Sequence, residues 1–176
     1  MSLAKNMGFD VPDIDILKVR DISLYAVKRY DRKTSEQGIV RLVQEDFCQA
    51  MNRNSQQKYN YSLKDCFDLI RRECSNPIED SRRLFNLVLF NGLIGNVDGH
   101  AKNISLLHNE NGTTLAPFYD LVSTLVYPQF TKKMAMRVAG KKRNFAHLQK
   151  HHFDSLSEEI NMKSNVVIKT ALNLAN

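Results

Sequence analysis

The amino-acid sequence predicts a mainly α-helical domain with a small β component. Two segments combine a helix N-cap signal with a following apolar stripe, which is the pattern of an amphipathic helix packed on a core. Short apolar segments around Leu24 and Leu106 favour strands instead. A length of 176 residues with 43% hydrophobic content can bury one sizeable core, so we expect a single domain over residues 1–176.

The first predicted elements are a strand and a short helix. Residues 24–27 are apolar and few, which predicts a short buried strand. Phe47, Ala50 and Met51 have helical spacing and predict a helix soon afterwards. The polar residues 53–58 then predict a surface loop.

Two longer helices are expected next. Ser62 and Asp65 have the spacing of a capping box, and one face of the following helix is apolar at Leu63, Cys66, Phe67, Ile70 and Cys74. Asn76 and Pro77 form a second start signal, with Pro in the first turn. The helix that follows is expected to be strongly buried through Leu84, Phe85, Val88, Leu89 and Leu93.

A β-hairpin is predicted after this helix. Residues 104–108 and 114–118 read as short strands, and residues 109–112 between them are turn formers that tolerate positive φ. Two further helices, at residues 145–155 and 164–175, are expected to complete the chain.

Three polar residues around the hairpin carry the functional signal. Asp98 is followed five residues later by Asn103, and Asp120 comes after the hairpin. In protein kinases one loop carries an Asp that accepts the proton of the substrate hydroxyl and an Asn that holds Mg²⁺, while a second Asp beyond a hairpin also holds metal. A hairpin would bring Asn103 beside Asp120, where their oxygens can share a hard cation. The order of elements therefore predicts a protein-kinase-like C-lobe.

A structural interpretation of the same residues remains open. Asp and Asn are common in turns and at helix ends, so a capped helix end followed by a polar hairpin would give a similar pattern. His100, inside the loop, could brace the loop through the backbone or contact phosphate.

Five ordered blocks of the sequence resemble the C-terminal part of the HipA family of bacterial serine/threonine kinase toxins. They are residues 27–32 (VKRYDR), 44–50 (QEDFCQA), 90–103, 119–124 (YDLVST) and 134–137 (MAMR). The resemblance covers most of the chain and implies a HipA-like C-terminal kinase domain.

The resemblance also implies roles for individual residues. Asp98 would be the catalytic base, and Asn103 and Asp120 the Mg²⁺ ligands. The nucleotide pocket would include His100, Ala101, Lys102, Asn103, Tyr119 and Asp120, with Lys28, Arg29 and Tyr30 as the hinge beside adenine. The family usually has Glu at the position of Lys28, but hinge contacts to adenine are largely made by backbone groups.

The phosphate-binding loop and the phosphate-pairing lysine of the family lie upstream of this region and have no match here. Gly8, Gly38 and Gly140 stand apart, so they do not form a glycine-rich phosphate cradle. We therefore expect a fragment of a longer kinase, in which residues 1–3 could be an expression-vector scar. A naturally truncated or split gene is the alternative.

The expected function follows from the motif and the resemblance together. It is an ATP- and Mg²⁺-dependent serine/threonine protein kinase of toxin–antitoxin type that transfers a phosphoryl group to a protein serine. By resemblance, the substrate would be a translation factor such as an aminoacyl-tRNA synthetase, and also the kinase itself. The implied partner is a DNA-binding antitoxin of the HipB type, through which the protein would reach operator DNA.

Two other functions fit parts of the sequence. A noncatalytic kinase-like module could bind an antitoxin or another subunit, although the intact set of Asp98, Asn103 and Asp120 argues against a decayed site. A metal-dependent phosphoesterase could use Asp98, His100 and Asp120, but no further carboxylates or histidines cluster with them.

Composition restricts the partners and the compartment. The net charge is +6, but the Lys and Arg residues are scattered in short runs that favour solvated surface over direct nucleic-acid binding. The three cysteines have no paired spacing and are expected to be buried thiols in a reducing cytoplasm. No apolar stretch approaches the roughly 20 residues that cross a bilayer, so a cytoplasmic protein without membrane contact is expected.

Overall fold

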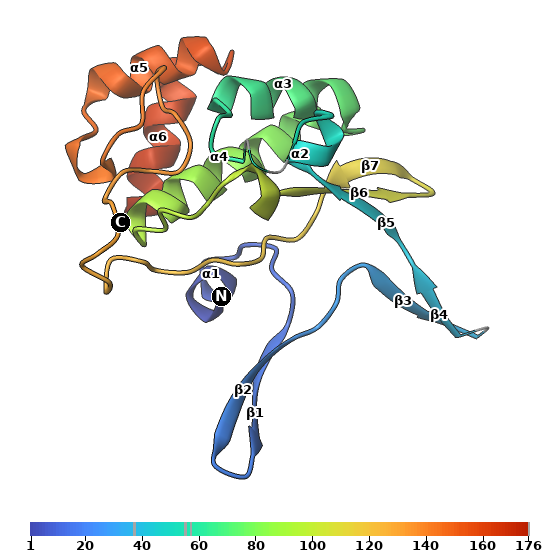
Figure 1. The fold of residues 1–176 in the computed structure, drawn as a ribbon. Helices are drawn as coiled ribbons and strands as arrows, with labels where there is room; N and C mark the ends of the chain where they lie inside the picture. Colours follow the sequence, from blue (N-terminus) through green and yellow to red (C-terminus); the bar gives the residue numbers. More distant parts are fainter. Residues whose placement is uncertain (37, 55, 57, 176) are drawn as a thin grey trace.

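The computed structural model of the protein describes residues 1–36, 38–54, 56 and 58–175, and it joins a helical region to a set of β-hairpins (Figure 1). The helices are α1 (Ser2–Asn6), α2 (Phe47–Ala50), α3 (Leu63–Glu73), α4 (Pro77–Leu93), α5 (Lys150–Glu159) and α6 (Ser164–Ala175), with short 3₁₀ turns η2 (Ala101–Asn103) and η3 (Phe145–His147). The strands are β1 (Ile14–Val19), β2 (Ile22–Val27), β3 (Arg32–Ser35), β4 (Gly38–Arg41), β5 (Val43–Asp46), β6 (Ser105–Asn109) and β7 (Gly112–Leu115).

Helices α3 and α4 form the centre of the core, and both begin where the sequence predicts. The Ser62 hydroxyl accepts a hydrogen bond from the backbone N–H of Asp65 at 3.1 Å, and the Asp65 carboxylate accepts one from the Ser62 N–H at 3.0 Å. Asn76 caps α4 with Pro77 in the first turn. Their inner faces bury large side chains, including Leu63, Phe67, Ile70, Leu84, Phe85 and Leu89. Burial of these faces supplies most of the hydrophobic stabilisation of this region.

The three-stranded antiparallel sheet β5-β6-β7 lies against this core and positions the loop that joins α4 to β6. Asp46 pairs with Ser105, and Leu106 pairs with Leu115. The predicted 104–118 hairpin is confirmed, although β7 begins earlier, at Gly112, and ends at Leu115. Residues 44–46 form a strand, and Asp46 then caps the predicted helix α2.

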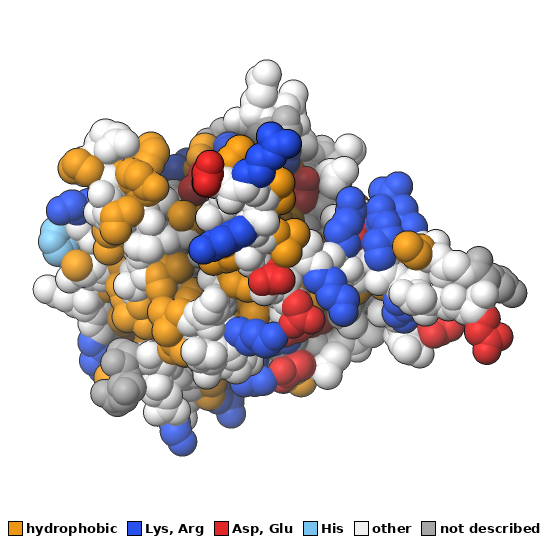
Figure 2. Space-filling view, turned by 90° about the horizontal axis from the view of Figure 1, so that it is seen from below, with side chains coloured by type: hydrophobic (Ala, Val, Ile, Leu, Met, Phe, Trp, Pro, Cys, Tyr) orange, Lys and Arg blue, Asp and Glu red, His pale blue; other side chains and the backbone are white. Residues whose placement is uncertain are grey.

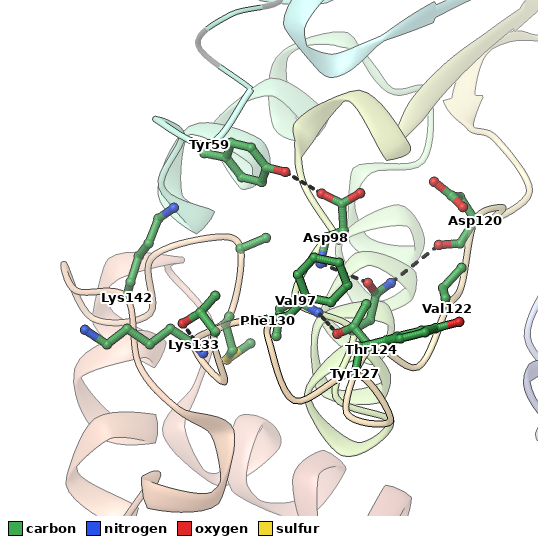
Figure 3. A pocket seen from close by; sticks show the side chains of 14 residues that line it. Tyr59, Val97, Asp98, Asp120, Val122, Thr124, Tyr127, Phe130, Lys133 and Lys142 are labelled. Atoms are coloured by element: carbon green, nitrogen blue, oxygen red, sulfur yellow. Dashed lines mark hydrogen bonds between the residues drawn. The ribbon is translucent and has the colours of Figure 1, made fainter.

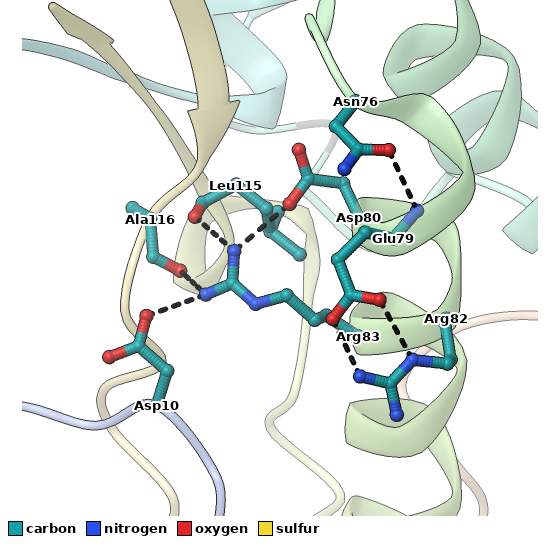
Figure 4. Close-up of polar contacts among 8 residues, drawn as sticks. All are labelled: Asp10, Asn76, Glu79, Asp80, Arg82, Arg83, Leu115 and Ala116. Carbon is teal, nitrogen blue, oxygen red and sulfur yellow. Dashed lines mark hydrogen bonds and ion pairs between the residues drawn. The ribbon is translucent and has the colours of Figure 1, made fainter.

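Arg83 connects three parts of the core, as Figure 4 shows. Its guanidinium donates to the Asp80 carboxylate at 2.9 Å, to the Leu115 carbonyl at 2.6 Å and to the Asp10 carboxylate at 2.8 Å. Its fourth contact, at 3.4 Å, is with the Ala116 carbonyl. Helix α4, the end of β7 and the N-terminal segment are therefore held by one cation.

The β1–β2 and β3–β4 hairpins project from the helical region (Figure 1). The predicted strand at residues 24–27 lies in β2, but the expectation that it is buried was wrong, because Leu24, Tyr25 and Val27 are largely exposed. A two-stranded ribbon has two faces, and no other described element covers them. Figure 2 shows hydrophobic side chains gathered with Lys and Arg on the underside of the molecule.

The remaining expectations are met in part. The predicted 145–155 helix is instead η3 followed by α5, and Leu93 at the end of α4 is 41% exposed. All three cysteines are buried free thiols, as expected. The expected surface loop at residues 53–58 includes residues 55 and 57, which lie outside the described part of the chain. Among the described helices, none has the length and apolar character that a bilayer crossing requires.

Candidate active site

The loop that carries Asp98 begins directly after α4 and is fixed by Asn96. The Asn96 side-chain amide donates to the Asn91 side chain at 3.0 Å and to the Asp120 carbonyl at 3.4 Å. Its oxygen accepts the backbone N–H of Asp98 at 3.1 Å. A buried Asn therefore ties the loop, the core helix and the Asp120 segment together, and networks of this kind hold geometry firmly when each member is satisfied.

Gly99 allows the loop to pack closely on α4. A Cβ at this position would lie 2.8 Å from the Asn91 side-chain nitrogen, which is closer than nonbonded atoms normally approach. Asn91 is itself held by Asn96, so it has little freedom to move away. The Gly after Asp98 is therefore a packing requirement.

The structure brings Asp98, Asn103 and Asp120 together. The Asn103 side-chain amide donates to the Asp98 carbonyl and to the Asp120 carboxylate, both at 3.0 Å. Asp120 has a φ of 56°, a left-handed conformation that Asp tolerates at some cost in energy. Non-Gly residues in this conformation are frequent at functional sites, and here the turn brings the carboxylate to Asn103.

Tyr59 contacts the Asp98 carboxylate, a partner that our sequence analysis missed. Its hydroxyl donates to Asp98 Oδ1, while no described residue donates to Oδ2 (Figure 3). Burial, and then the hydrogen bond to the carboxylate, raises the pKa of Tyr59 to about 12. The hydroxyl thus stays protonated at neutral pH and donates. Because the two residues are 39 positions apart, no local pattern could indicate the contact.

His100 is buried behind this pair. Its ring lies edge-on to Tyr59 with centroids 5.1 Å apart, and its Nε2 is 3.6 Å from Asp98 Oδ1. Burial lowers the pKa of His100, partly opposed by the Asp98 charge, so the imidazole is neutral at pH 7. Its Nδ1 has no hydrogen-bond partner among the described residues. Both predicted roles, bracing the loop and contacting phosphate, stay open.

A cavity of about 440 Å³ joins the predicted hinge to the Asp120 segment. Lys28, Arg29 and Tyr30 line it together with Tyr119 and Asp120. The Tyr30 and Tyr119 rings are stacked with centroids 6.0 Å apart. The side chains of Lys28 and Arg29 are 77% and 61% exposed.

Hydrogen bonds fix both sides of this cavity. The Tyr119 hydroxyl donates to the Lys102 carbonyl at 3.0 Å and lies 2.8 Å from the Ser105 hydroxyl. On the hinge side, the Arg29 guanidinium donates to both carboxylate oxygens of Asp31, at 2.8 and 2.6 Å. Residues on both sides of the cavity are therefore tied to their neighbours by hydrogen bonds.

A second cavity of about 620 Å³ lies beside Asp98 (Figure 3). Tyr59, Asp98 and Asp120 line it together with residues from the 122–142 segment. Asp120 is common to the two cavities, and Asp98 belongs to this one. The arrangement can therefore hold a phosphoryl donor in the cavity on one side of Asp120 and a phosphoryl acceptor in the cavity on the other side.

Four residues that were predicted for the nucleotide pocket line neither cavity. In the described structure these are His100, Ala101, Lys102 and Asn103, and Ala101 is fully buried. Lys102 contributes its carbonyl to Tyr119. Their assignment to the nucleotide pocket stays a prediction.

The side chains of Asn103 and Asp120 contain oxygen atoms of the kind that Mg²⁺ takes as ligands. The described residues contain no group of three or more His, Cys, Asp and Glu side chains that could hold a metal. Mg²⁺ sites in phosphotransfer enzymes need fewer protein side chains, because one or two carboxylates bind the ion together with substrate phosphates and water. The Asn103 nitrogen faces Asp120, which leaves the amide oxygen directed elsewhere. The residue types suit Mg²⁺ held jointly with phosphate, provided that the Asn103 amide turns so that its oxygen, and not its nitrogen, faces the ion.

Comparison with known proteins places the chain in a family. A family model described as the HipA-like C-terminal domain matches residues 1–175. The Sinorhizobium fredii protein named "Putative kinase Y4mE" is 36% identical over 99% of this chain and 42% of its own length. The serine/threonine-protein kinase toxin HipA of Shewanella oneidensis is 31% identical over 78% of this chain and 36% of its own length. The chain spans less than half the length of either relative.

Solved structures agree. The HipA chain in the Shewanella oneidensis HipA, HipB and operator DNA complex superposes with a TM-score of 0.91 and 27% identity, covering 99% of this chain and 45% of that chain. The Helicobacter pylori proinflammatory kinase CtkA shares the fold alone, with a TM-score of 0.65, 16% identity, and coverage of 99% and 85%. The predicted kinase-like C-lobe is therefore confirmed, and the chain belongs to the family of HipA-like C-terminal domains.

Proposed function

We propose that this domain is the catalytic-loop part of an ATP- and Mg²⁺-dependent serine/threonine protein kinase of toxin–antitoxin type. The observation that carries the proposal is the meeting of two cavities at Asp120, with Asp98 on one side and the hinge residues 28–30 on the other. Relatives named as kinases support the same family-level activity. The nucleotide would occupy the hinge cavity, and the acceptor would enter the cavity beside Asp98.

The chemistry assigned to each residue follows from its contacts. Asp98 is 52% exposed, and its Oδ2 is available to accept the proton of a serine hydroxyl while the serine oxygen attacks the γ-phosphorus of ATP and ADP leaves. Tyr59 occupies Oδ1 and so orients the carboxylate. Bound Mg²⁺, held by Asn103 and Asp120, would neutralise charge on the phosphoryl oxygens.

The complete protein and its partner are part of the proposal. We infer that the domain works with an upstream segment that carries a phosphate-binding loop and a lysine, as the family resemblance implies; the matched relatives are more than twice as long as this chain. A DNA-binding antitoxin of the HipB type is the proposed partner, since the similar structure is a complex of HipA with HipB and operator DNA.

Calorimetric titration of this chain with a nonhydrolysable ATP analogue tests the nucleotide site. Binding is expected to require Mg²⁺, to be lost in Asp120→Ala and to persist in Asp98→Asn, since Asp98 does not line the hinge cavity. Equal binding by Asp120→Ala would refute the assigned ligand.

Transfer to protein is tested in the complete kinase. Asp98→Asn is expected to reduce phosphoryl transfer by at least about a hundredfold while leaving nucleotide affinity unchanged. Transfer at the wild-type rate would refute the assigned base. Stable antitoxin binding by wild type and by an Asp98→Asn/Asp120→Ala double variant, with no transfer by either, would favour the noncatalytic module.

A further inference from the structure

The cavity beside Asp98 has an apolar wall on the surface. Val122, Tyr127 and Phe130 line it and are each about half exposed, and the two aromatic rings meet edge-on with centroids 5.9 Å apart. Met134 and Ala135, which are buried, also contribute to the lining. An exposed apolar concavity of this kind is typical of a site that receives a hydrophobic side chain.

Two cations share this cavity. Lys133 and Lys142 line it, and Figure 3 shows them on the side opposite Asp120. Within the described residues, neither lysine is in an ion pair. Lys142 Nζ lies 5.0 Å from the centroid of the Tyr59 ring, whose hydroxyl contacts Asp98. Positive charge is therefore available close to the assigned base.

The acidic residues of the cavity cannot balance these lysines without leaving their assigned roles. Asp98 and Asp120 are the carboxylates that line it in the described part of the chain, and the proposed reaction uses both. The cavity thus offers an apolar wall and unpaired cations to whatever enters. A complementary occupant carries an apolar side chain and negative charge.

We propose that this cavity binds the acceptor segment of the protein substrate, and that it selects a serine flanked by a large apolar side chain and by carboxylates. The inference rests on the proposed kinase function and adds the chemistry of its acceptor. The apolar side chain packs against Phe130 and Tyr127, and the carboxylates contact Lys133 and Lys142. The acceptor hydroxyl then lies at Asp98.

A protein segment fits this cavity better than a nucleic acid. Single-stranded nucleic acids bind in long positive grooves with exposed aromatic faces on which bases stack. Here the aromatic rings pack edge-on against each other, and two carboxylates lie in the same cavity, where they would repel a phosphate backbone. A single apolar side chain needs no stacking face, and a peptide can place its few carboxylates beside Lys133 and Lys142, on the side opposite Asp120, whereas a continuous phosphate backbone would have to pass both cavity carboxylates.

Fluorescence anisotropy with labelled peptides tests the proposal on this chain without nucleotide. The acidic probe is Gly-Glu-Glu-Phe-Ser-Glu-Gly, and its twins replace every Glu by Lys or the Phe by Gln. The acidic probe is expected to bind at least about tenfold more tightly than the basic twin. A Lys133→Glu/Lys142→Glu double variant is expected to reverse that order.

Matched variants distinguish binding in the cavity from nonspecific effects of net charge and of surface hydrophobicity. Lys33→Glu/Lys169→Glu makes the same change in net charge at exposed lysines outside the cavity and is expected to leave both affinities unchanged to within about twofold. Phe130→Ser is expected to remove the preference for Phe over Gln. Ile39→Ser, at an exposed position of β4, is expected to keep it.

Three results would overturn the proposal. The first is equal affinity for the acidic and basic probes. The second is an equal loss of affinity for the acidic probe in the two lysine double variants. The third is an oligothymidylate probe that binds more tightly than the acidic peptide and loses that binding in Lys133→Glu/Lys142→Glu. Peptide selectivity by this chain without phosphoryl transfer by the complete protein would keep this docking site and remove the kinase function. Transfer by the complete kinase without peptide selectivity would remove the docking site and keep the kinase function.

Discussion

In the α3–α4 region Phe67 and Phe85 are fully buried, whereas in the β1–β2 hairpin Ile16 and Ile22 remain 65% and 63% exposed. The first region has a core of its own, and the second is a ribbon with apolar side chains on the surface. The candidate site uses both, because Asp98 follows α4 while the hinge follows β2. The difference indicates that the base is positioned by core packing, and the hinge by turns and ion pairs.

Truncation of core and hairpin side chains should separate the two regions most clearly. Phe85→Ala is expected to lower the free energy of unfolding by about 3–5 kcal/mol, because it leaves a cavity under α4. Ile22→Thr keeps a β-branched side chain on an exposed strand and is expected to change it by less than about 0.5 kcal/mol. Urea unfolding measures both. Comparable losses would mean that the hairpin belongs to the same cooperative unit as the core.

Arg83 offers a second test of how the core is held. Arg83→Met leaves the buried Asp80 carboxylate without its cation and is expected to cost about 3 kcal/mol. The neighbouring Arg82 pairs with Glu79 on the exposed face, and Arg82→Met is expected to cost less than about 1 kcal/mol. Thermal and urea unfolding of the two variants give the comparison. Similar losses would show that the Arg83 contacts add nothing beyond a surface pair.

The same contrast explains what the sequence could predict. The starts of α3 and α4 were predicted correctly because Ser62, Asp65, Asn76 and Pro77 act within one helical turn. The hairpin of β6 and β7 was predicted for the same reason, since its turn residues are local. Burial of residues 24–27 was wrongly expected because an apolar run does not reveal whether another element will cover it.

For the site, the motif predicted that Asn103 and Asp120 would meet, and the hairpin brings them together. The contact of Tyr59 with Asp98 and that of Asn96 with Asp120 join residues 39 and 24 positions apart. Long-range contacts of this kind depend on the packing of several elements. No spacing rule in a single sequence contains them, and the supporting residues were therefore missed.

Tyr59 gives a smaller effect that is confined to the rate. Tyr59→Phe in the complete kinase is expected to lower kcat by about tenfold with KM for ATP unchanged, because the Asp98 carboxylate loses one charge-assisted hydrogen bond. Tyr127→Phe keeps the ring that is proposed to pack against the substrate and removes only a hydroxyl that does not contact Asp98, so it is expected to leave kcat unchanged. Since the pKa of Tyr59 is raised to about 12, the effect should be constant between pH 6 and pH 9. Equal kcat values for the two variants would show that the Tyr59 hydrogen bond does not assist Asp98 as the base.

Asp31 at the hinge should give the smallest effect, one that appears only in acid. Hydrogen bonds from Arg29, followed by the charges of Arg29 and Arg32, lower the pKa of Asp31 to about 2. A depressed carboxylate pKa stabilises the folded state above the unfolded pKa of about 4, and that contribution is lost as the pH falls toward 2.

Because Arg29 is largely exposed and screened by solvent, we expect Asp31→Asn to cost about 1 kcal/mol or less at pH 7. The difference from wild type should shrink between pH 4 and pH 2 in urea unfolding. Asp68→Asn, whose partly exposed carboxylate forms helical ion pairs with Lys64 and Arg71, is the control and should show a still weaker trend. If the Asp31→Asn difference stays constant across this window, the ion pair does not stabilise the hinge, and the hinge geometry depends on backbone turns alone.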